Sequence, residues 1–151
     1  QRGYSGSQGR GGCRFRRGEG SGKSRFFNQG QAEPKSQIYL FLYSASWCGP
    51  CCREIPHLKE VYEALKGRGF EIYAVSIDGD TERWRQFVAE NGLAWTNVIS
   101  EGGGKESPAA AMYGIRFIPS NFLIAPDGTI AAKNVPGSLL QERLEKLMEQ
   151  Q

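Results

Sequence analysis

The sequence has 151 residues, a length that fits one domain with a single hydrophobic core and leaves little room for a second. Hydrophobic residues make up 39% of the chain and charged residues 23%, and no apolar run approaches the roughly 20 residues of a membrane-spanning helix. We therefore expect a soluble protein whose membrane tether, if it has one, lies outside this sequence. No basic segment followed by an apolar run opens the chain, so a secretion signal has been removed or was never present.

The net charge of +3 is unevenly distributed along the chain. Residues 1–37 carry eight Lys and Arg, two Glu and nine of the twenty glycines, but only six apolar residues. Such a segment buries too little apolar surface to offset the entropy of ordering it, so we interpret it as a Gly/Arg-rich tail or poorly ordered extension. Arginine and aromatic side chains can contact nucleic acid, but composition alone is a weak signal, and we expect no nucleic-acid partner.

Residues 38–151 have the pattern of a folded α/β domain. The apolar run at 38–43 predicts a strand buried on both faces, and residues 70–77 predict a second strand. Between them, apolar residues recur with helical spacing from Ile55 to Leu65. A strand, helix and strand of this length predict a right-handed parallel unit.

The second half of the domain alternates shorter elements, bounded by turn-forming and capping residues. In chain order the sequence predicts a helix from 81 to about 91, a strand at 96–99, a short helix at 109–113, strands at 121–124 and 130–135, and a closing helix. Ser107 is the expected N-cap of the short helix, and Ser138 with Gln141 forms a capping-box pair for the closing helix.

Cys48 and Cys51 are the residues expected to carry chemistry. They stand three positions apart where a strand gives way to a helix, so the first sulfur lies at the helix N-terminus, where unpaired N–H groups and the helix dipole stabilise a thiolate. The second sulfur lies about one turn inside, close enough to attack a mixed disulfide formed by the first. Gly49 permits a tight turn, Pro50 suits the first helical turn, and Trp47 can cover one side of the pair.

A permanent disulfide and a metal site are the other interpretations of this pair. A bridge that closes so short a loop removes little chain entropy, so stability is a poor reason for the spacing. Zinc needs further ligands, and the nearest are Cys52 and His57. All four residues lie at the start of one helix, where the adjacent Cys51 and Cys52 point about 100° apart, and there is no second Cys-x-x-Cys. We therefore favour redox chemistry without a metal or an organic cofactor.

Two segments carry a family resemblance: the run from Ser46 to Leu58, which contains the cysteine pair, and the run from Tyr113 to Gly128. Together they resemble the thioredoxin superfamily, and within it the extracytoplasmic thiol:disulfide oxidoreductases of the TlpA and ResA kind. The resemblance spans residues 38–149. It implies a thioredoxin-like fold, with a central mixed sheet flanked by helices and an α–β insertion, from Asp80 to about Ile99, between the second strand and the Pro119 segment.

The resemblance also implies roles for three residues outside the cysteine pair. Pro119 is expected to follow a cis peptide bond and to lie against the redox pair, while the backbone of Ile118 pairs with an incoming peptide. Glu54, three residues after the second cysteine, is expected to accept the proton of the resolving thiol. Without the resemblance, we would interpret Glu54 as a solvent-exposed charged residue on the helix surface. Thioredoxin proper has a buried aspartate six positions before the first cysteine, where this chain has Leu42.

The expected activity is thiol–disulfide exchange. Cys48 attacks a protein disulfide, Cys51 resolves the mixed disulfide, and a separate donor protein restores the dithiol. The family setting implies a reductase of the bacterial periplasm. One alternative is a peroxiredoxin-like thiol peroxidase, because Ser46 weakly imitates the threonine that precedes a peroxidatic cysteine. The other is a non-catalytic thioredoxin-like binding module, with the basic tail holding nucleic acid or a partner.

Overall fold

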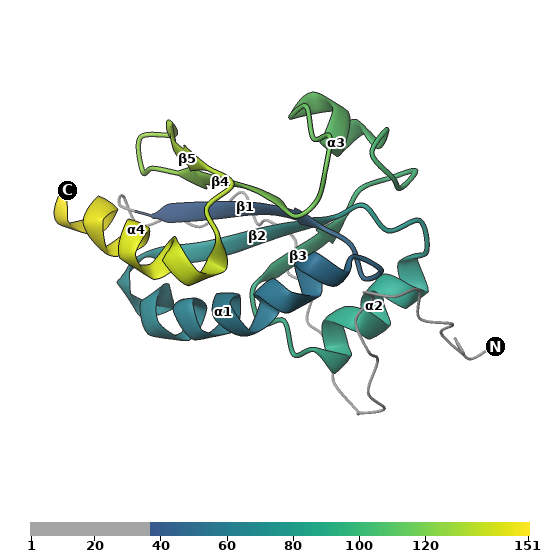
Figure 1. Cartoon of the computed structure of the whole chain (residues 1–151), viewed down its shortest axis with the longest axis horizontal. Helices are drawn as coiled ribbons and strands as arrows, with labels where there is room; N and C mark the ends of the chain where they lie inside the picture. Colours follow the sequence, from purple (N-terminus) through teal and green to yellow (C-terminus); the bar gives the residue numbers. More distant parts are fainter. Residues whose placement is uncertain (1–36) are drawn as a thin grey trace, which may run out of the picture.

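The computed structural model describes residues 37–151, so the predicted tail at 1–37 lies almost entirely outside the described residues. The elements are, in chain order, β1 (Ile38–Ser44), α1 (Gly49–Leu65), the 3-10 turn η1 (Lys66–Arg68), β2 (Phe70–Ser76), α2 (Thr81–Glu90), β3 (Thr96–Ile99), α3 (Pro108–Met112), β4 (Ser120–Ile124), β5 (Ile130–Lys133) and α4 (Gly137–Glu149) (Figure 1). Among residues 37–151, no helix has the length and apolar character needed to cross a bilayer.

The five strands form one mixed sheet in the order β3-β2-β1-β4-β5. β1 and β3 both run parallel to β2, whereas β4 runs antiparallel to its neighbours β1 and β5. The predicted α–β insertion forms α2 and β3, and the mixed sheet flanked by helices is confirmed. Because β1 and β2 are parallel, their carboxyl ends meet at one edge of the sheet, where α1 begins.

The two faces of the sheet are buried against different layers. Figure 1 shows α1 and α4 on one side of the sheet and α3 on the other. Ile38, Leu40 and Leu42 of β1 belong to the core cluster that includes residues of α1 and α4, whereas Tyr43 belongs to a second cluster with Ala110 of α3. This alternation confirms the prediction that the first strand is buried on both faces.

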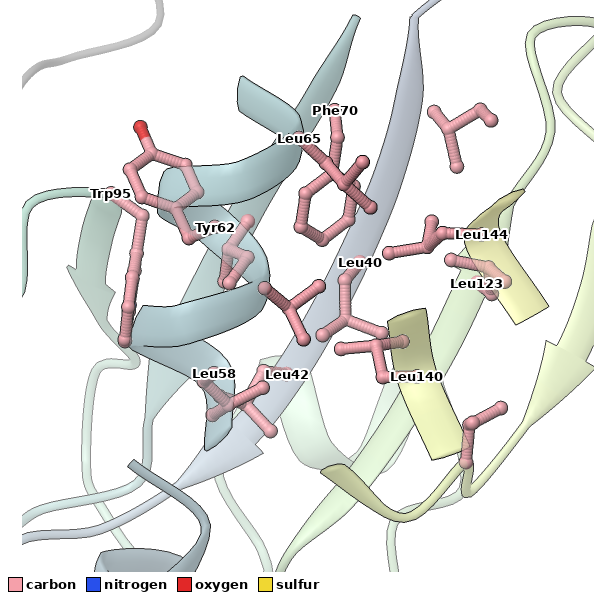
Figure 2. Packing of buried hydrophobic residues seen from close by; sticks show 14 of the residues in the cluster. Leu40, Leu42, Leu58, Tyr62, Leu65, Phe70, Trp95, Leu123, Leu140 and Leu144 are labelled. Atoms are coloured by element: carbon pink, nitrogen blue, oxygen red, sulfur yellow. The ribbon is translucent and has the colours of Figure 1, made fainter. Parts of the chain in front are cut away.

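The main core lies between the sheet and the helices α1 and α4 (Figure 2). The spacing of apolar residues along the strands and helices places them on the surfaces that face each other across this core. The large side chains that are fully buried there include Leu40, Leu65, Phe70, Leu123, Leu140 and Leu144. The closing helix is therefore part of the core and joins the carboxyl end of the chain to the helix that carries the cysteines.

The capping box predicted for the closing helix is wrong. α4 begins at Gly137 with Pro136 in the N-cap position, which offers no side-chain hydrogen bond, and Ser138 lies inside the helix. The Gly137 N–H instead donates to Glu54 Oε2 at 2.6 Å, so a carboxylate from α1 satisfies the helix start. In contrast, Ser107 caps α3 as predicted, by accepting from the Ala110 N–H at 3.4 Å.

The second strand pair also differs slightly from the prediction. β5 ends at Lys133 rather than continuing to Val135. Asn134 adopts a positive φ of 51°, which leaves the extended conformation that a strand requires. Nevertheless, the Asn121 side chain bonds both the N–H and the carbonyl of Val135, so this segment remains attached to β4.

The aromatic side of the sheet gives a pH-dependent prediction. Burial raises the pKa of Tyr43 to about 12, and the nearby Tyr113 and Tyr73 add to the shift. The fold thus favours the protonated phenol, whose stabilisation is complete below pH 10 and is lost as the pH rises towards 12. We expect the free energy of unfolding, measured by urea denaturation, to fall by about 2 kcal/mol more in the wild type than in Tyr43→Phe over that window. Identical pH dependence in the two proteins would contradict this expectation.

Candidate active site

The cysteine pair lies at the junction between β1 and α1 (Figure 1). Cys48 is the N-cap of α1, and its Sγ forms a disulfide with Cys51 Sγ, with the two Cα atoms 5.3 Å apart. Cys48 Sγ also accepts a hydrogen bond from the Cys51 N–H at 3.2 Å. The first sulfur therefore lies at the helix N-terminus, where negative charge on it is stabilised by an N–H group and by the helix dipole.

The residues around the two cysteines occupy the places that the sequence predicts. Gly49 is the first residue of α1 and is buried, and Pro50 lies in the first turn, where it needs no hydrogen-bond acceptor. Both cysteines are only 5% exposed, whereas Trp47, directly before them, is 45% exposed. An apolar ring thus faces solvent beside a disulfide that is otherwise covered by the fold.

The peptide bond between Ile118 and Pro119 is cis, as the resemblance implies. The antiparallel pairing of β1 and β4 places Tyr43 opposite Ser120, so the residues before β4 lie beside those that follow β1. Pro119 lines the same cavity as Cys51, and Ile118 packs against the cluster that contains both cysteines. The sheet therefore brings together two segments that lie far apart in the sequence.

A cavity of about 30 Å³ lies on the inner side of the pair. Three of its lining side chains are titratable, namely Cys51, Glu54 and Asp78. The remainder of the lining is mostly apolar and comes from β1, α1, α2 and the approach to β3, including Leu42, Ile55, Leu58, Trp84, Phe87, Val88, Leu93 and Trp95. Cys51 therefore shares a mostly apolar cavity with two carboxyl groups.

Glu54 is half-buried on α1 and lines this cavity with Cys51. Its Oε2 accepts the 2.6 Å hydrogen bond from the Gly137 N–H at the start of α4. A Cβ atom on Gly137 would lie 2.5 Å from Glu54 Oε2 and 2.9 Å from His57 Cβ, so only glycine fits there without displacing its neighbours. The Gly137 N–H at the start of α4 thus fixes the position of a carboxylate that lines the same cavity as Cys51.

Sequence reasoning missed Asp78, which follows β2 and is 2% exposed. Its carboxylate accepts hydrogen bonds from the N–H and Oγ of Ser46 at 2.9 and 2.5 Å, and from Ser76 Oγ at 2.5 Å. Its position in the sequence could have identified it. An aspartate that follows a buried parallel strand is expected at the edge of the sheet where α1 also begins.

Cys52 and His57 were the additional ligands considered for zinc. Within the part of the chain that the structure describes, no group of three or more His, Cys, Asp or Glu side chains is arranged to hold a metal ion. His57 is exposed, and Cys52 Sγ lies 3.9 Å from the Ser46 carbonyl oxygen.

The mixed sheet, the cis proline and the cysteine pair at a helix N-terminus define a thioredoxin-like domain. The chain belongs to the AhpC/TSA family, whose model matches residues 28–133. It is 31% identical over 103 residues to thiol-disulfide oxidoreductase ResA of Bacillus thuringiensis, covering 68% of this chain and 57% of that protein. It is 35% identical over 101 residues to ResA of Oceanobacillus iheyensis, covering 67% of this chain and 50% of that protein. The chain thus spans about half the length of these relatives.

Solved structures show the same likeness. The thioredoxin domain of a thiol-disulfide oxidoreductase from Bacteroides vulgatus is 31% identical and matches with a TM-score of 0.67, covering 76% of this chain and 81% of that one. A thiol-disulfide oxidoreductase from Bacteroides fragilis is 30% identical with the same TM-score, covering 74% and 81%. The resemblance to the thioredoxin superfamily and the predicted fold are therefore confirmed.

Proposed function

We propose that this domain is a thiol–disulfide oxidoreductase that reduces protein disulfides through Cys48 and Cys51. The observation that carries the proposal is the disulfide at the start of α1, in which Cys48 Sγ accepts a hydrogen bond from the Cys51 N–H. The same N–H stabilises the thiolate of Cys48 once the disulfide is reduced. The names of the curated relatives and of the solved structures support this activity.

The reaction proceeds in two exchanges. The Cys48 thiolate attacks one sulfur of a substrate disulfide, and the other substrate sulfur leaves as a thiolate. Cys51 then gives up its proton and attacks Cys48 Sγ, which releases the second substrate thiol and leaves the Cys48–Cys51 disulfide. Two electrons have passed to the substrate, and a donor protein dithiol returns them. No metal or organic cofactor takes part in either exchange.

The substrate docks on the exposed apolar surface beside the pair. Trp47 and Phe117 are 45% and 57% exposed and lie next in sequence to Cys48 and Ile118, respectively. An extended peptide pairs with the backbone of Ile118, which carries its disulfide to the side of the redox pair where Pro119 lies.

The proposed setting is the bacterial periplasm or its equivalent outside the cytoplasmic membrane, in a protein of the TlpA kind. The named relatives ResA from Bacillus and Oceanobacillus support a bacterial setting. Because an oxidising compartment maintains disulfides, a dithiol there acts only when an electron donor renews it. A membrane tether outside this sequence would keep the domain close to such a donor.

The test is the reduction of insulin disulfides by the dithiol-treated protein, together with the equilibrium of the pair against glutathione. We expect the wild type to accelerate insulin reduction and to form the disulfide reversibly. Cys48→Ser should lose nearly all of the acceleration, because a hydroxyl group in place of the thiol cannot start the exchange. Equal acceleration by the two proteins would refute the role of Cys48.

The two alternatives give different outcomes. Peroxide consumption faster than that of a free thiol, with no insulin reduction, would favour the peroxidase. Salt-sensitive binding to nucleic acid or to a protein that survives replacement of both cysteines by serine, again without insulin reduction, would favour the binding module.

Glu54 is proposed as the proton acceptor for Cys51. Replacing it by glutamine preserves an oxygen that accepts from the Gly137 N–H but removes the base. We expect Glu54→Gln to slow the second exchange about a hundredfold and the first by less than about threefold. Stopped-flow tryptophan fluorescence with a peptide disulfide, to which Trp47 beside the pair contributes, separates the two phases.

Two further variants control this experiment. Glu60→Gln makes the same change at an exposed position of α1 and should react like the wild type. Gly137→Ala keeps the Glu54 charge but displaces the carboxylate, so it should also slow the second exchange. Equal slowing of both phases in Glu54→Gln would mean that Glu54 acts on the whole site and not on the proton of Cys51.

A further inference from the structure

Asp78 is a buried carboxylate that the proposed exchange does not use. It lies immediately after Ile77 at the carboxyl end of β2, and it is 2% exposed. Both of its oxygens accept hydrogen bonds, Oδ1 from Ser46 Oγ and Oδ2 from the Ser46 N–H and from Ser76 Oγ. Three donors to one buried carboxyl group compensate for its loss of hydration.

These hydrogen bonds fasten the loop that carries the first cysteine. Ser46 stands two residues before Cys48, and the Cys48 N–H donates to the Ala45 carbonyl oxygen at 3.2 Å within the same loop. The Ile77 N–H donates to the Ser44 carbonyl oxygen at 2.9 Å, so the end of β2 holds both sides of Ala45. The position of Cys48 at the start of α1 therefore depends on a contact with β2.

Asp78 also lines the same cavity as Cys51. Asp78, Glu54 and Cys51 are the titratable groups that line the cavity, whereas the lining side chains from α2, the approach to β3 and β3 itself are uncharged. Because most of the cavity lining is apolar, the negative charge of Asp78 is only weakly screened there. Such a charge beside the cysteine pair disfavours the thiolate form of its thiols. Less stable thiolates mean a less stable reduced form, and hence a lower reduction potential.

We propose that Asp78 is a positioning residue for the redox pair, which fastens Ser46 to the end of β2 and, through its charge, opposes ionisation of the cysteine thiols. The inference rests on the proposed function, because it concerns the same two cysteines. It assigns to a residue just after β2 part of the control over how strongly the domain reduces its substrates.

The test compares Asp78→Asn with the wild type by two measurements on the whole chain. The pH dependence of iodoacetamide alkylation reports the pKa of the attacking thiol, and glutathione mixtures report the equilibrium between dithiol and disulfide. We expect the thiol pKa to fall by about one unit, and the equilibrium to shift about fivefold towards the dithiol, which corresponds to a potential about 20 mV higher. Asp80→Asn removes an exposed charge two residues away, preserves a good N-cap for α2, and should shift neither quantity.

Ser76→Ala is the second variant, and its expected effect has the opposite sign. It removes a hydroxyl that donates to Asp78 Oδ2 and accepts from the Asp78 N–H at 2.9 Å, but it keeps the charge and both bonds to Ser46. With one hydrogen-bond donor fewer, the Asp78 charge is less compensated and acts more strongly on the cysteines. The pKa of the attacking thiol should therefore rise. A contact that is merely structural would move both variants in the same direction, and that result would overturn the proposal. If Asp78→Asn does not fold, the absence of a rise in Ser76→Ala overturns it alone.

Insulin reduction by the wild type distinguishes a failure of the Asp78 proposal from a failure of the proposed function. A wild type that reduces insulin, combined with an unchanged thiol pKa and an unchanged glutathione equilibrium in folded Asp78→Asn, refutes the role of Asp78 and leaves the proposed function standing. A wild type that fails to reduce insulin counts against the proposed function, whatever the variants do.

Discussion

Cys51→Ser should accumulate as a covalent complex with its substrate. Cys48 keeps its place at the N-terminus of α1 and its access to the N–H of residue 51, so the first exchange proceeds. The serine hydroxyl cannot attack the mixed disulfide, so the covalent complex between Cys48 and the substrate persists until an external thiol cleaves it. We expect turnover in the insulin assay to fall about a hundredfold or more, and a non-reducing gel to show an adduct with a peptide disulfide that dithiothreitol removes.

Cys48→Ser is the matched control, because it exchanges the same atoms at the other sulfur of the same disulfide. It should form no lasting adduct and should lose turnover, because the attacking thiol is gone. The double variant Cys48→Ser/Cys51→Ser should form no adduct. An adduct that persists in that double variant would show that another sulfur attacks the substrate.

Leu140→Ala should cost about 3 kcal/mol of the free energy of unfolding. Leu140 is 0% exposed, and Figure 2 shows it in the core between α4 and the sheet, near Leu40. Removing its branched end loses apolar burial and leaves a cavity that close-packed neighbours fill only in part. Since domains of this size are typically stable by only about 5–15 kcal/mol, the variant should unfold at a clearly lower urea concentration.

The neighbouring Leu139→Ala provides the comparison. Leu139 lies in the same helix turn but is 51% exposed, so its replacement should change the free energy of unfolding by less than about 0.5 kcal/mol. Alanine and leucine have similar helix propensities, so the difference between the two variants measures burial. Equal losses would mean that α4 is not docked through Leu140.

The local sequence around the cysteines was enough to predict their geometry. A buried strand, a Cys-Gly-Pro-Cys run and a helical stripe place Cys48 at the N-cap and Pro50 in the first turn, and the structure has both there. These features depend on backbone preferences over a few residues, and such preferences act whatever the rest of the chain does. The same is true of Ser107, whose hydroxyl caps a helix that begins at the next residue.

Predictions failed where a distant residue competes with a local one. Ser138 and Gln141 have the spacing of a capping box, yet the start of α4 is satisfied by Glu54, which lies 83 residues before Gly137. Packing of α4 against α1 brings that carboxylate to the helix start, and the local motif is not used. Asp78 escaped notice for a related reason, because its donors Ser46 and Ser76 belong to two different segments of the chain.

The sequence by itself determined the class of fold, the redox pair and the helix end on which that pair lies, because periodicity and capping act over short distances along the chain. Only the tertiary structure decided which groups surround the pair. Pro119 reaches it through the antiparallel pairing of β4 with β1, Glu54 is bonded to the start of α4, and Asp78 comes from the segment that follows β2. Contacts of this kind follow from the pairing of strands and the docking of helices, and they are specified by the packing of the whole domain.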